Sequence, residues 1–379
     1  MRILYCAIDQ RVPGPHGGAV HVTAVAQGLA ARGHDVHVLA APGDGPFPHG
    51  ATWHAMTPPL GRRELRWLRA GAVSELAARL RPDAILERYY NFGGEGLRAA
   101  ARTGAIGVLE VNAPVVDYPG SPKQWLDRAL LVEPMRRWRE RQCAMAHLIV
   151  SPTRAILPPS VPASRVLEIE WGADTDRFTP DATGSIPFER REGETIAVFA
   201  GAFRPWHGAA QIVDAIRMLR ARGRHDIRAV LIGTGPEHAR VCEMAAPLGD
   251  AVVLTGPLSH ESMPAALAAA DIGVAPFDTA AHAPLAIEFY WSPLKVFEYM
   301  AAGLPVVAPV IPRLARIVRD GVDGVLYSSA GALADALAAL TDPQRRRELG
   351  AAARARVVAE FSWAKHCETL ERAIQDTHR

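Results

Sequence analysis

The stretch SPLKVFEYMAAGLPVV, residues 292–307, predicts a helix, a stop and a buried strand in immediate succession. Ser292 and Pro293 are typical of a helix N-cap and first helical position. Gly303, shortly before a proline, is typical of a helix end. The first turn of a helix favours negative charge, because its free backbone N–H groups carry a partial positive charge. Lys295 stands in that turn instead, so the question is which anion it faces.

Apolar runs of strand length alternate with helical patterns along the rest of the chain. The expected strands are 2–8, 35–41, 83–90, 105–112, 147–152, 166–172, 195–202, 227–235, 251–256 and 305–310. The expected helices include 17–34, 94–104, 208–223 and the one that begins at Ser292. Strands that alternate with helices predict parallel sheets with helices on both faces, and hence an α/β protein.

The length of 379 residues suggests two such domains in tandem. A polar segment with proline, glycine and mixed charge, 175–194, is the expected linker. The predicted domains are Rossmann-like and span 1–180 and 181–355, followed by a C-terminal helix over 356–379. Parallel sheets bind ligands beyond the carboxyl ends of their strands, so two facing sheets would place a ligand in the cleft between the domains.

The composition is that of an ordinary soluble protein, with 49% hydrophobic residues, 22% charged residues and a formal net charge of +2. This near-neutral charge argues against a nucleic-acid partner. The four cysteines form no CxxC pair, which favours free thiols in a reducing compartment, although a long-range disulfide or zinc site stays open. No apolar run is long enough for a signal peptide or a membrane span, so we expect a cytoplasmic protein.

Two other strand-to-helix turns carry glycine or basic residues. Gly17 and Gly18 let the backbone approach a ligand closely at a helix start. Gly201, Arg204 and His207 follow the first strand of the second series. Each glycine is also compatible with a purely structural role in its turn.

A bound anion would explain these features together. Arg204, the Lys295 ammonium and the amides at the start of its helix could converge on one diphosphate, which supplies the missing negative charge. The alternative is that Lys295 points into water or pairs with Glu298, three residues further on.

The helix stretch, continued as SPLKVFEYMAAGLPVVAP, resembles the signature helix of retaining family 4 glycosyltransferases with the GT-B fold (glycosyl transferases group 1). PHGGAVHVTAVAQGLAARGHDVHVL is similar to their N-terminal glycine turn and helix, and VLEIEWGADTDRFTP to their crossover into the second domain. The resemblance implies an acceptor bound mainly by 1–180 and a nucleotide-sugar donor held mainly by 181–355. It also implies C-terminal helices that cross back to the first domain, and no cofactor besides the donor substrate.

On this resemblance, Glu298 matches the second glutamate of the family's E-x7-E motif, which bonds the donor ribose hydroxyls. An ionised carboxylate can accept hydrogen bonds from two vicinal hydroxyls. The first glutamate of the motif falls at Tyr290 and is absent, while Glu288 stands two residues earlier as a substitute. The loop expected to turn its amides to phosphate consists of Ser292, Pro293, Leu294 and Lys295.

The resemblance also assigns roles to other polar residues. His207 stands where the family usually has a lysine, and it either donates a bond to phosphate or caps the following helix. Arg204 lies between the two usual basic positions and can grip a phosphate bidentately. Asn112 replaces a frequent histidine and can orient a sugar hydroxyl. Glu110 is either the ionisable group there or a buried carboxylate paired with Arg88.

Retention of configuration implies that the leaving diphosphate itself accepts the acceptor's proton. The expected catalytic residues then stabilise charge: Arg204 and Lys295 at the phosphate, with Glu298 on the ribose and Asn112 beside the sugar. We expect the nucleotide base at the loop of Gly256 and Leu258.

The run Asp-Thr-Asp at 174–176 looks like a metal-binding D-x-D motif. Its place in the crossover turn favours turn chemistry instead, so we expect no metal. The competing functional hypotheses are a sugar-nucleotide epimerase of the same fold and a non-catalytic protein that binds nucleotide sugars.

Two segments are rich in arginine and tryptophan. Segment 61–71 has four arginines against one glutamate, and segment 121–142 has a lysine and five arginines against three acidic residues. Such segments suit peripheral contact with the inner face of an anionic membrane or a lipid-diphosphate acceptor. A solvated helix face with its tryptophans tucked inward is the alternative.

Overall fold

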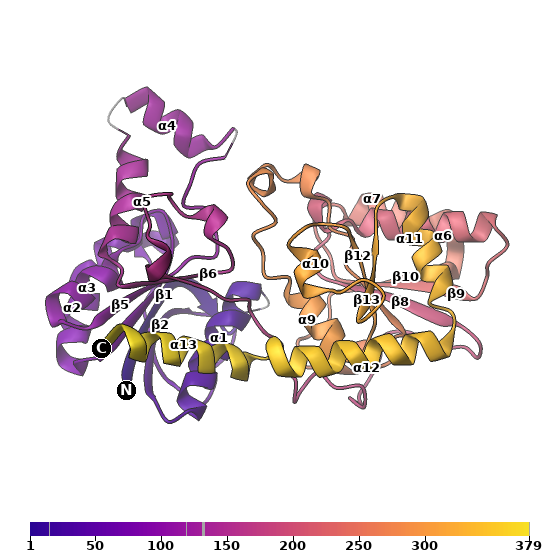
Figure 1. Ribbon diagram of the computed structural model, residues 1–379, viewed down its shortest axis with the longest axis horizontal. Coiled ribbons are helices and arrows are strands. Elements are labelled where there is room, and N and C mark those ends of the chain that lie inside the picture. Colours follow the sequence, from indigo (N-terminus) through magenta and orange to yellow (C-terminus); the bar gives the residue numbers. More distant parts are fainter. Residues whose placement is uncertain (15, 119, 131–132, 379) are drawn as a thin grey trace. The chain divides into compact units, whose positions relative to one another are not determined.

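The computed structural model describes residues 1–14, 16–118, 120–130 and 133–378. The residues outside this description are Pro15, Pro119, Leu131, Val132 and Arg379. Some of them belong to segments for which predictions were made above, namely the first glycine turn, the basic segment 121–142 and the last helix. The chain forms two compact units (Figure 1). Unit 1 comprises Met1–Trp171, Tyr290–Ser292 and Trp363–Arg379, and unit 2 comprises Gly172–Phe289 and Pro293–Ser362. The domain limits expected from the sequence stay predictions.

Unit 1 is built on a parallel seven-stranded sheet with the order β3-β2-β1-β4-β5-β6-β7. Its strands are β1 (Arg2–Val12), β2 (Asp35–Pro42), β3 (Thr52–Ala55), β4 (Ala84–Arg88), β5 (Ile106–Glu110), β6 (Leu148–Ser151) and β7 (Val166–Glu168). Residues 3–8 of β1 are buried on both faces of the sheet, as expected for a central parallel strand.

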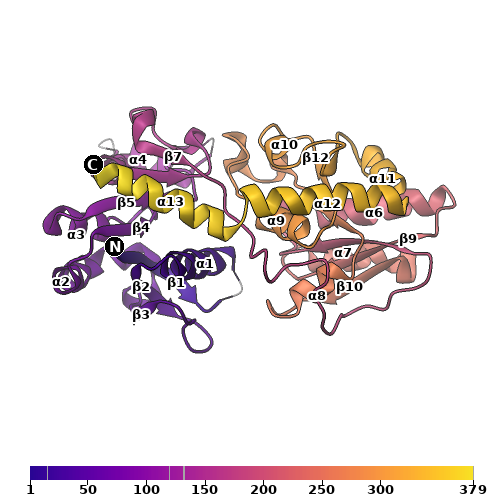
Figure 2. The same cartoon turned by 60° about the horizontal axis from the view of Figure 1, so that its bottom comes forward.

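Helices cover both faces of this sheet. The helices of unit 1 are α1 (Gly17–Ala31), α2 (Ala70–Leu80), α3 (Glu95–Thr103), α4 (Pro122–Leu130), α5 (Pro134–Met145) and α13 (Trp363–His378). Leu4 and Cys6 of β1 share a core cluster with α2 and α3. Strand residues alternate in direction, and Tyr5 accordingly meets His21 of α1 on the other face. The C-terminal helix α13 packs against α1 within this unit (Figure 2).

Unit 2 has a parallel six-stranded sheet with the order β10-β9-β8-β11-β12-β13. Its strands are β8 (Thr195–Ala200), β9 (Ile227–Ile232), β10 (Val252–Gly256), β11 (Ile272–Val274), β12 (Val306–Pro309) and β13 (Gly324–Tyr327). Its helices are α6 (Ala209–Ala221), α7 (His238–Ala245), α8 (Met263–Ala268), α9 (Leu294–Ala301), α10 (Leu314–Ile317), α11 (Ala330–Ala339) and α12 (Pro343–Glu360). The main core cluster of unit 2 joins α6 and α11 to the central strands.

These sheets confirm the predicted fold class of two parallel α/β units. The short strands β3 and β13 were not expected, and β1 runs further than its apolar residues suggest. The segment 175–194 has no helix or strand, yet it is not a free linker. Phe178 is buried, and Arg354 donates hydrogen bonds to the carbonyls of Thr175 and Phe178 at 2.7 and 2.6 Å. Among the described residues, no helix combines the length and apolar character that crossing a bilayer requires.

Candidate functional site

Helix α9 begins without the cap that the sequence predicts. Pro293 occupies the N-cap position, and no side chain in the described part of the chain caps the helix. The Ser292 hydroxyl is used elsewhere in unit 1: it donates to Glu170 Oε2 at 2.5 Å and accepts from the Trp171 N–H at 3.0 Å. The Ser292 cap is therefore wrong, because partners that are distant in sequence attract its hydroxyl. The first turn of α9 keeps backbone N–H groups that no side chain satisfies.

The end of α9 is as predicted. The helix stops at Ala301, and Gly303 follows with a positive φ of 73°. The N–H of Leu304 returns to the Tyr299 carbonyl at 3.0 Å, which closes the last turn before β12.

Lys295 has a buried ammonium. Its Nζ has no hydrogen-bond partner among the residues that the structure describes. The Nζ lies 4.0 Å from the centroid of the Phe199 ring and 5.4 Å from that of Phe277. Burial lowers the pKa of Lys295 to about 7, against the effect of the Glu298 carboxyl, which favours the charged form. The Nζ thus points neither into water nor into a close ion pair, so both alternatives raised above are wrong.

Glu298 lies one turn further along α9. Burial raises the pKa of its carboxyl to about 8, although the positive charges of Lys295 and Arg177 oppose this shift. Arg177 was missed by the sequence reasoning. It follows the Asp-Thr-Asp run directly, and its guanidinium donates to the His260 carbonyl at 2.7 Å. The signal that could have found it is a basic residue placed in the crossover turn.

The turn after β8 lies against the lysine. Gly201 has a φ of 147°, and a Cβ built there would lie 2.9 Å from Lys295 Nζ. The backbone of this turn also meets the turn after β9, where a Cβ on Gly233 would lie 2.0 Å from the Gly201 carbonyl oxygen. Gly201 therefore allows backbone and ammonium to approach each other, and its role at a ligand stays a prediction.

His207 lies in the same turn and is held by it. Its Nδ1 is 2.7 Å from the Ala202 carbonyl, so Nδ1 carries the proton that forms this bond. Burial, then the Lys295 charge, lower the pKa of His207 to about 3. Helix α6 has no side-chain cap, so the predicted cap by His207 is wrong. The neutral ring then presents Nε2 as an acceptor rather than as a donor to phosphate.

Arg204 is exposed, and its guanidinium lies 5.3 Å from the centroid of the Trp206 ring. Trp206 in turn packs against His282, with ring centroids 4.2 Å apart. The structure thus assembles Lys295, Glu298, Gly201 and His207 around the start of α9, while Arg204 lies on the surface of the same turn.

The loop expected to hold a nucleotide base follows β10. Gly256 has a φ of 72° and accepts a hydrogen bond from the N–H of Gly233 at 2.9 Å. Leu258 is half-buried. Asp174, in the crossover turn, accepts from the backbone N–H groups of Asp176 and Arg177 at 3.2 and 3.1 Å. The prediction of turn chemistry for the Asp-Thr-Asp run is confirmed.

In unit 1, the first glycine turn lies beside a polar side chain. Helix α1 starts at Gly17, and no side chain of the described residues caps it. A Cβ on Gly18 would lie 2.2 Å from Gln10 Oε1, so a larger residue there would have to displace the Gln10 side chain. A Cβ built on Gly17 would lie 3.6 Å from the Trp171 ring. Gln10 and Trp171 were not predicted for this site.

Asn112 belongs to a buried polar cluster. Its Nδ2 donates to Glu110, and its Oδ1 accepts from Trp171 Nε1 at 3.0 Å. Glu110 also accepts from the Tyr5 hydroxyl and lies 2.8 Å from Arg88 Nη1. Burial raises the pKa of Glu110. The reading of Glu110 as a buried carboxylate paired with Arg88 is confirmed.

His21 completes this cluster and was missed from sequence. Its Nδ1 is 3.3 Å from Glu110 Oε1, and its ring lies against Trp171 with centroids 4.5 Å apart. Its Nε2 is buried without a hydrogen-bond partner among the described residues. Burial, then the charge of Arg88, lower the pKa of His21 well below its usual value. A histidine four residues after a glycine turn is the signal that could have found it.

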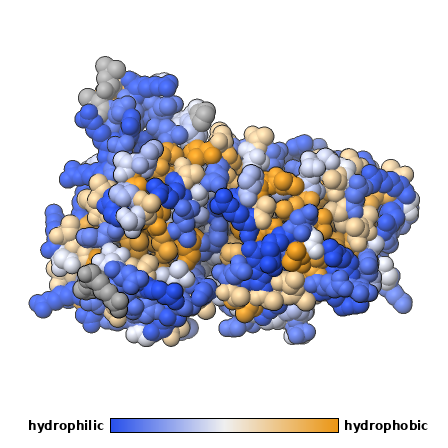
Figure 3. Space-filling model, in the orientation of Figure 1, coloured by the Kyte–Doolittle hydropathy of each residue, from blue (hydrophilic) through white to orange (hydrophobic). Residues whose placement is uncertain are grey.

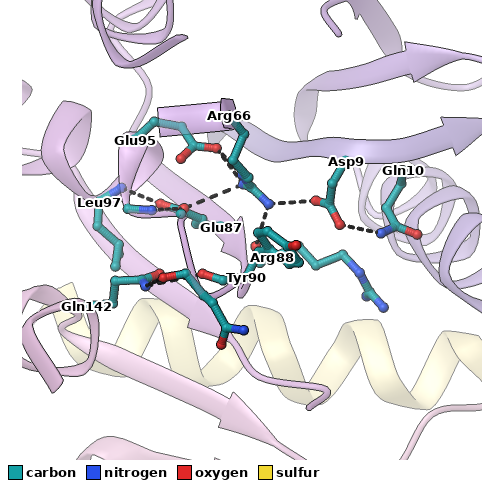
Figure 4. A network of polar contacts seen from close by, with 12 residues as sticks. Asp9, Gln10, Arg66, Glu87, Arg88, Tyr90, Glu95, Leu97 and Gln142 are labelled. Carbon is teal, nitrogen blue, oxygen red and sulfur yellow. Dashed lines mark hydrogen bonds and ion pairs between the residues drawn. The ribbon is translucent and has the colours of Figure 1, made fainter. Parts of the chain in front are cut away.

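A second buried network lies in unit 1 (Figure 4). Arg66 is completely buried and pairs with Asp9 at 2.6 Å, Glu95 at 2.5 Å and Glu87 at 3.5 Å. Glu87 accepts from the backbone N–H groups of Gly94 and Leu97 near the start of α3. Arg66 belongs to the basic segment 61–71, so one of its four arginines serves the interior rather than an external surface.

The two parallel α/β units define the class of fold, which solved glycosyltransferases of the GT-B type share. Anabaena Alr3699/HepE, solved in complex with UDP-glucose, has a TM-score of 0.72 at 19% identity, over 99% of this chain and 100% of that chain. This likeness establishes the fold alone.

Sequence comparison specifies the family. The profile of Glycosyltransferase Family 4 matches residues 15–157, and that of Glycosyl transferases group 1 matches residues 194–342. The chain belongs to the family 4, group 1 glycosyltransferases.

Two curated relatives show how far the similarity extends. The D-inositol 3-phosphate glycosyltransferase of Geodermatophilus obscurus is 33% identical over 54% of this chain and 46% of its own length. The phosphatidyl-myo-inositol mannosyltransferase of Mycobacterium leprae is 25% identical over 99% of this chain and 96% of its own. The match thus spans only about half the length of the more identical relative.

Proposed function

We propose that the protein transfers a sugar from a nucleotide-diphosphate sugar to a hydroxyl acceptor, with retention of anomeric configuration. Unit 2 holds the donor and unit 1 the acceptor. The observation that carries this proposal is the buried Lys295 ammonium at the start of α9. Among the described residues, it has no counter-charge within ion-pair distance and no side chain caps the helix. An unpaired buried cation is costly unless a ligand supplies the anion.

The donor diphosphate is the anion that fits this place. Lys295 contacts it from one side, and the first N–H groups of α9 contribute their partial positive charge. Gly201 admits the phosphate close to the backbone. Arg204, exposed in the same turn, can reach toward the phosphate from solvent and bind it bidentately.

The nucleoside occupies the adjacent part of unit 2. Glu298 accepts hydrogen bonds from the ribose hydroxyls, for which its carboxylate must be ionised. The base lies on the loop of Gly256 and Leu258, which follows β10. In the same proposal, Glu288 contacts the donor sugar in place of the missing first glutamate of the motif.

The chemistry requires no protein nucleophile. The acceptor oxygen bonds to the anomeric carbon as the bond from that carbon to the phosphate oxygen breaks, and the departing phosphate takes the acceptor's proton. Lys295 and the α9 amides stabilise the charge that develops on the leaving phosphate. Removal of one such electrostatic group typically costs about 10²–10³-fold in rate. Asn112, fixed by Glu110 and Trp171, orients a sugar hydroxyl with its remaining N–H.

The acceptor is proposed only as a hydroxyl compound. The two relatives described above are named for D-inositol 3-phosphate and phosphatidyl-myo-inositol. Inositol phosphates and phosphatidylinositol are therefore the first acceptors to test, and other polysaccharide, glycolipid or secondary-metabolite acceptors follow.

The test begins with a thermal-shift screen of UDP, GDP, ADP and dTDP, followed by sugar-transfer assays with the matching donors. One diphosphate should raise the melting temperature, and NMR of the product should show the donor's anomeric configuration. Glu298→Ala should weaken nucleotide binding, whereas Lys295→Ala should weaken it as well and reduce turnover more strongly. If neither substitution changes binding or transfer, the site is misplaced; binding without transfer would favour a non-catalytic protein.

A further inference from the structure

Helix α4 of unit 1 exposes an apolar stripe. Positions i, i+3, i+4, i+7 and i+8 of the helix lie on one face, and here all are exposed and apolar; they are Pro122, Trp125, Leu126, Ala129 and Leu130. Trp125 is 71% exposed and Leu130 51% exposed, which is unusual for side chains of this size. We call these five residues the α4 stripe.

Polar contacts hold the other face of α4 against α5. Asp127 is buried and accepts hydrogen bonds from the N–H groups of Met135 and Arg136 at 2.7 and 2.9 Å. Arg139, buried in α5, pairs with Asp117 at 2.9 Å and lies 3.6 Å from Asp127. Because the polar face of α4 is the one that packs inward, the α4 stripe is held outward by the fold.

Unpaired positive charge accompanies the stripe. Arg128 on α4, and Arg137 and Arg141 on α5, are exposed and have no ion pair among the described residues. Arg136, in contrast, pairs with Glu133 and Glu140. Figure 3 has the orientation of Figure 1. The surface seen there in the region of α4 is mainly hydrophilic. The hairpin of α4 and α5 therefore combines a narrow apolar edge with free guanidinium groups.

We propose that the α4 stripe docks the protein on an anionic lipid bilayer. Tryptophan and leucine enter the boundary between headgroups and acyl chains, and the arginines meet anionic headgroups while their stems extend along the apolar surface. The free arginines decide the occupant, because they are complementary to a negatively charged surface and a single nine-residue helix offers little area for a stable protein interface.

This proposal goes beyond the glycosyl-transfer function and does not depend on it. The sequence suggested membrane contact through both basic segments, and this proposal assigns the contact to the second one, 121–142. In segment 61–71 Arg66 is buried in the carboxylate network, so that segment has less free charge than its sequence suggests. Segment 61–71 keeps Trp67 and Leu68 exposed, and the docking surface proposed here is the described part of the α4–α5 hairpin.

The experiment is vesicle co-sedimentation of the full chain with phosphatidylcholine vesicles, with and without phosphatidylglycerol. The first variant replaces the large side chains of the stripe (W125S, L126S, L130S) and the second the free charges (R128Q, R137Q, R141Q). All six side chains are exposed, so both variants should fold. Each should lower binding to the anionic vesicles at least about tenfold. Val358→Ser and Arg347→Gln, exposed positions of unit 2, serve as matched controls without effect.

Trp125→Phe gives a second readout, since it keeps the apolar surface. It should retain binding but lose fluorescence quenching by lipids brominated in their acyl chains. Absence of binding, or equal binding to neutral vesicles, would overturn the proposal. Concentration-dependent self-association that the stripe variant abolishes, without vesicle binding, would assign the stripe to a protein interface and overturn it as well.

Discussion

Each of the two units buries a basic group, and the surroundings of these two groups differ in charge. Arg66 in unit 1 has three carboxylates around it, at 2.6, 2.5 and 3.5 Å. The Lys295 ammonium in unit 2 has an aromatic ring at 4.0 Å and no hydrogen-bond partner among the described residues. Proteins bury charges in pairs because desolvation is costly. A buried charge that is paired within the protein has a structural role, whereas a buried charge without a partner suggests that a ligand supplies the counter-charge.

Arg66→Met tests the structural side of this comparison and should have the largest effect. It leaves Asp9, Glu87 and Glu95 buried without their cation. Breaking a buried ion pair in this way typically costs about 3–5 kcal/mol of unfolding free energy. Urea unfolding followed by circular dichroism would measure the loss.

Arg62→Met, in the same segment but exposed, is the control for Arg66 and should stay within about 0.5 kcal/mol of the wild type. If Arg66→Met costs no more than this control, the network contributes little and the contrast between the units fails.

Lys295→Met tests the ligand side, and its two readouts should move in opposite directions. Stability without ligand should stay equal or rise by about 1 kcal/mol, since an unpaired buried amine is replaced by a side chain of similar size. Turnover should fall about 10²–10³-fold if the ammonium stabilises the leaving phosphate. Unfolding curves and steady-state kinetics on the same preparation give both numbers. A loss of several kcal/mol without ligand would mean that Lys295 has a structural partner after all.

The strand and helix pattern was predictable from the sequence, because the apolar runs of β1 and β8 are local signals that the parallel sheets satisfy. The position of Lys295 in the first turn of α9 was predictable from the helix pattern. Its role at an anion, inferred because a cation there conflicts with the helix dipole, stays a prediction. The Ser292 cap and the His207 cap failed, because both side chains bond to groups that only the fold brings near: Glu170 for the serine, the Ala202 carbonyl for the histidine.

The buried networks were beyond local reasoning. Arg66 stands among exposed arginines in the sequence, and nothing nearby indicates that Asp9 and Glu95 surround it. Likewise, His21 and Trp171 meet in the Asn112 cluster from distant parts of the chain. Polar partners across a sheet depend on register and on helix placement, which hydrophobic periodicity does not specify.

Gly201→Ala tests whether the backbone turn beside Lys295 contributes to the same ligand site. Its φ of 147° disfavours any side chain, and the added Cβ would lie 2.9 Å from Lys295 Nζ. We expect a loss of about 1–3 kcal/mol in stability together with weaker diphosphate binding. Gly223→Ala has a φ of 75° and open space around its Cβ, so it isolates the backbone cost. Equal nucleotide affinity in both variants would show that the ammonium and this turn do not share a ligand.

Nucleotide affinity should depend on pH through Lys295. Burial lowers the pKa of Lys295 to about 7, so above that pH the free protein holds a neutral amine. A bound diphosphate favours the ammonium and raises this pKa, so binding takes up a proton. Through Lys295 alone, affinity would therefore fall by up to about tenfold per pH unit between about pH 7.5 and 8.5. Calorimetry in buffers of different ionisation enthalpy would detect the proton directly.

Two variants resolve this pH dependence. Lys295→Met should abolish the fall in affinity with pH. The pKa of Glu298 is raised to about 8 by burial, and its ionisation as an acceptor for ribose would act in the opposite direction. Glu298→Gln should therefore lower affinity yet steepen the remaining slope. A slope that survives in Lys295→Met belongs to another group.

Removal of metal ions by a chelator should have the smallest effect. The experiment tests whether Lys295 and the start of α9 supply the positive charge that a metal ion would otherwise supply. The transfer proposed above needs positive charge at the leaving phosphate, and unit 2 offers the Lys295 ammonium and the start of α9 for it. The one D-x-D run commits Asp174 to two backbone N–H groups in the crossover turn. Prolonged incubation with EDTA should therefore leave turnover within experimental error, and Asp176→Asn should do the same. A loss that Mg²⁺ or Mn²⁺ restores would give the metal the role assigned to Lys295, and the unpaired ammonium would then need another anion.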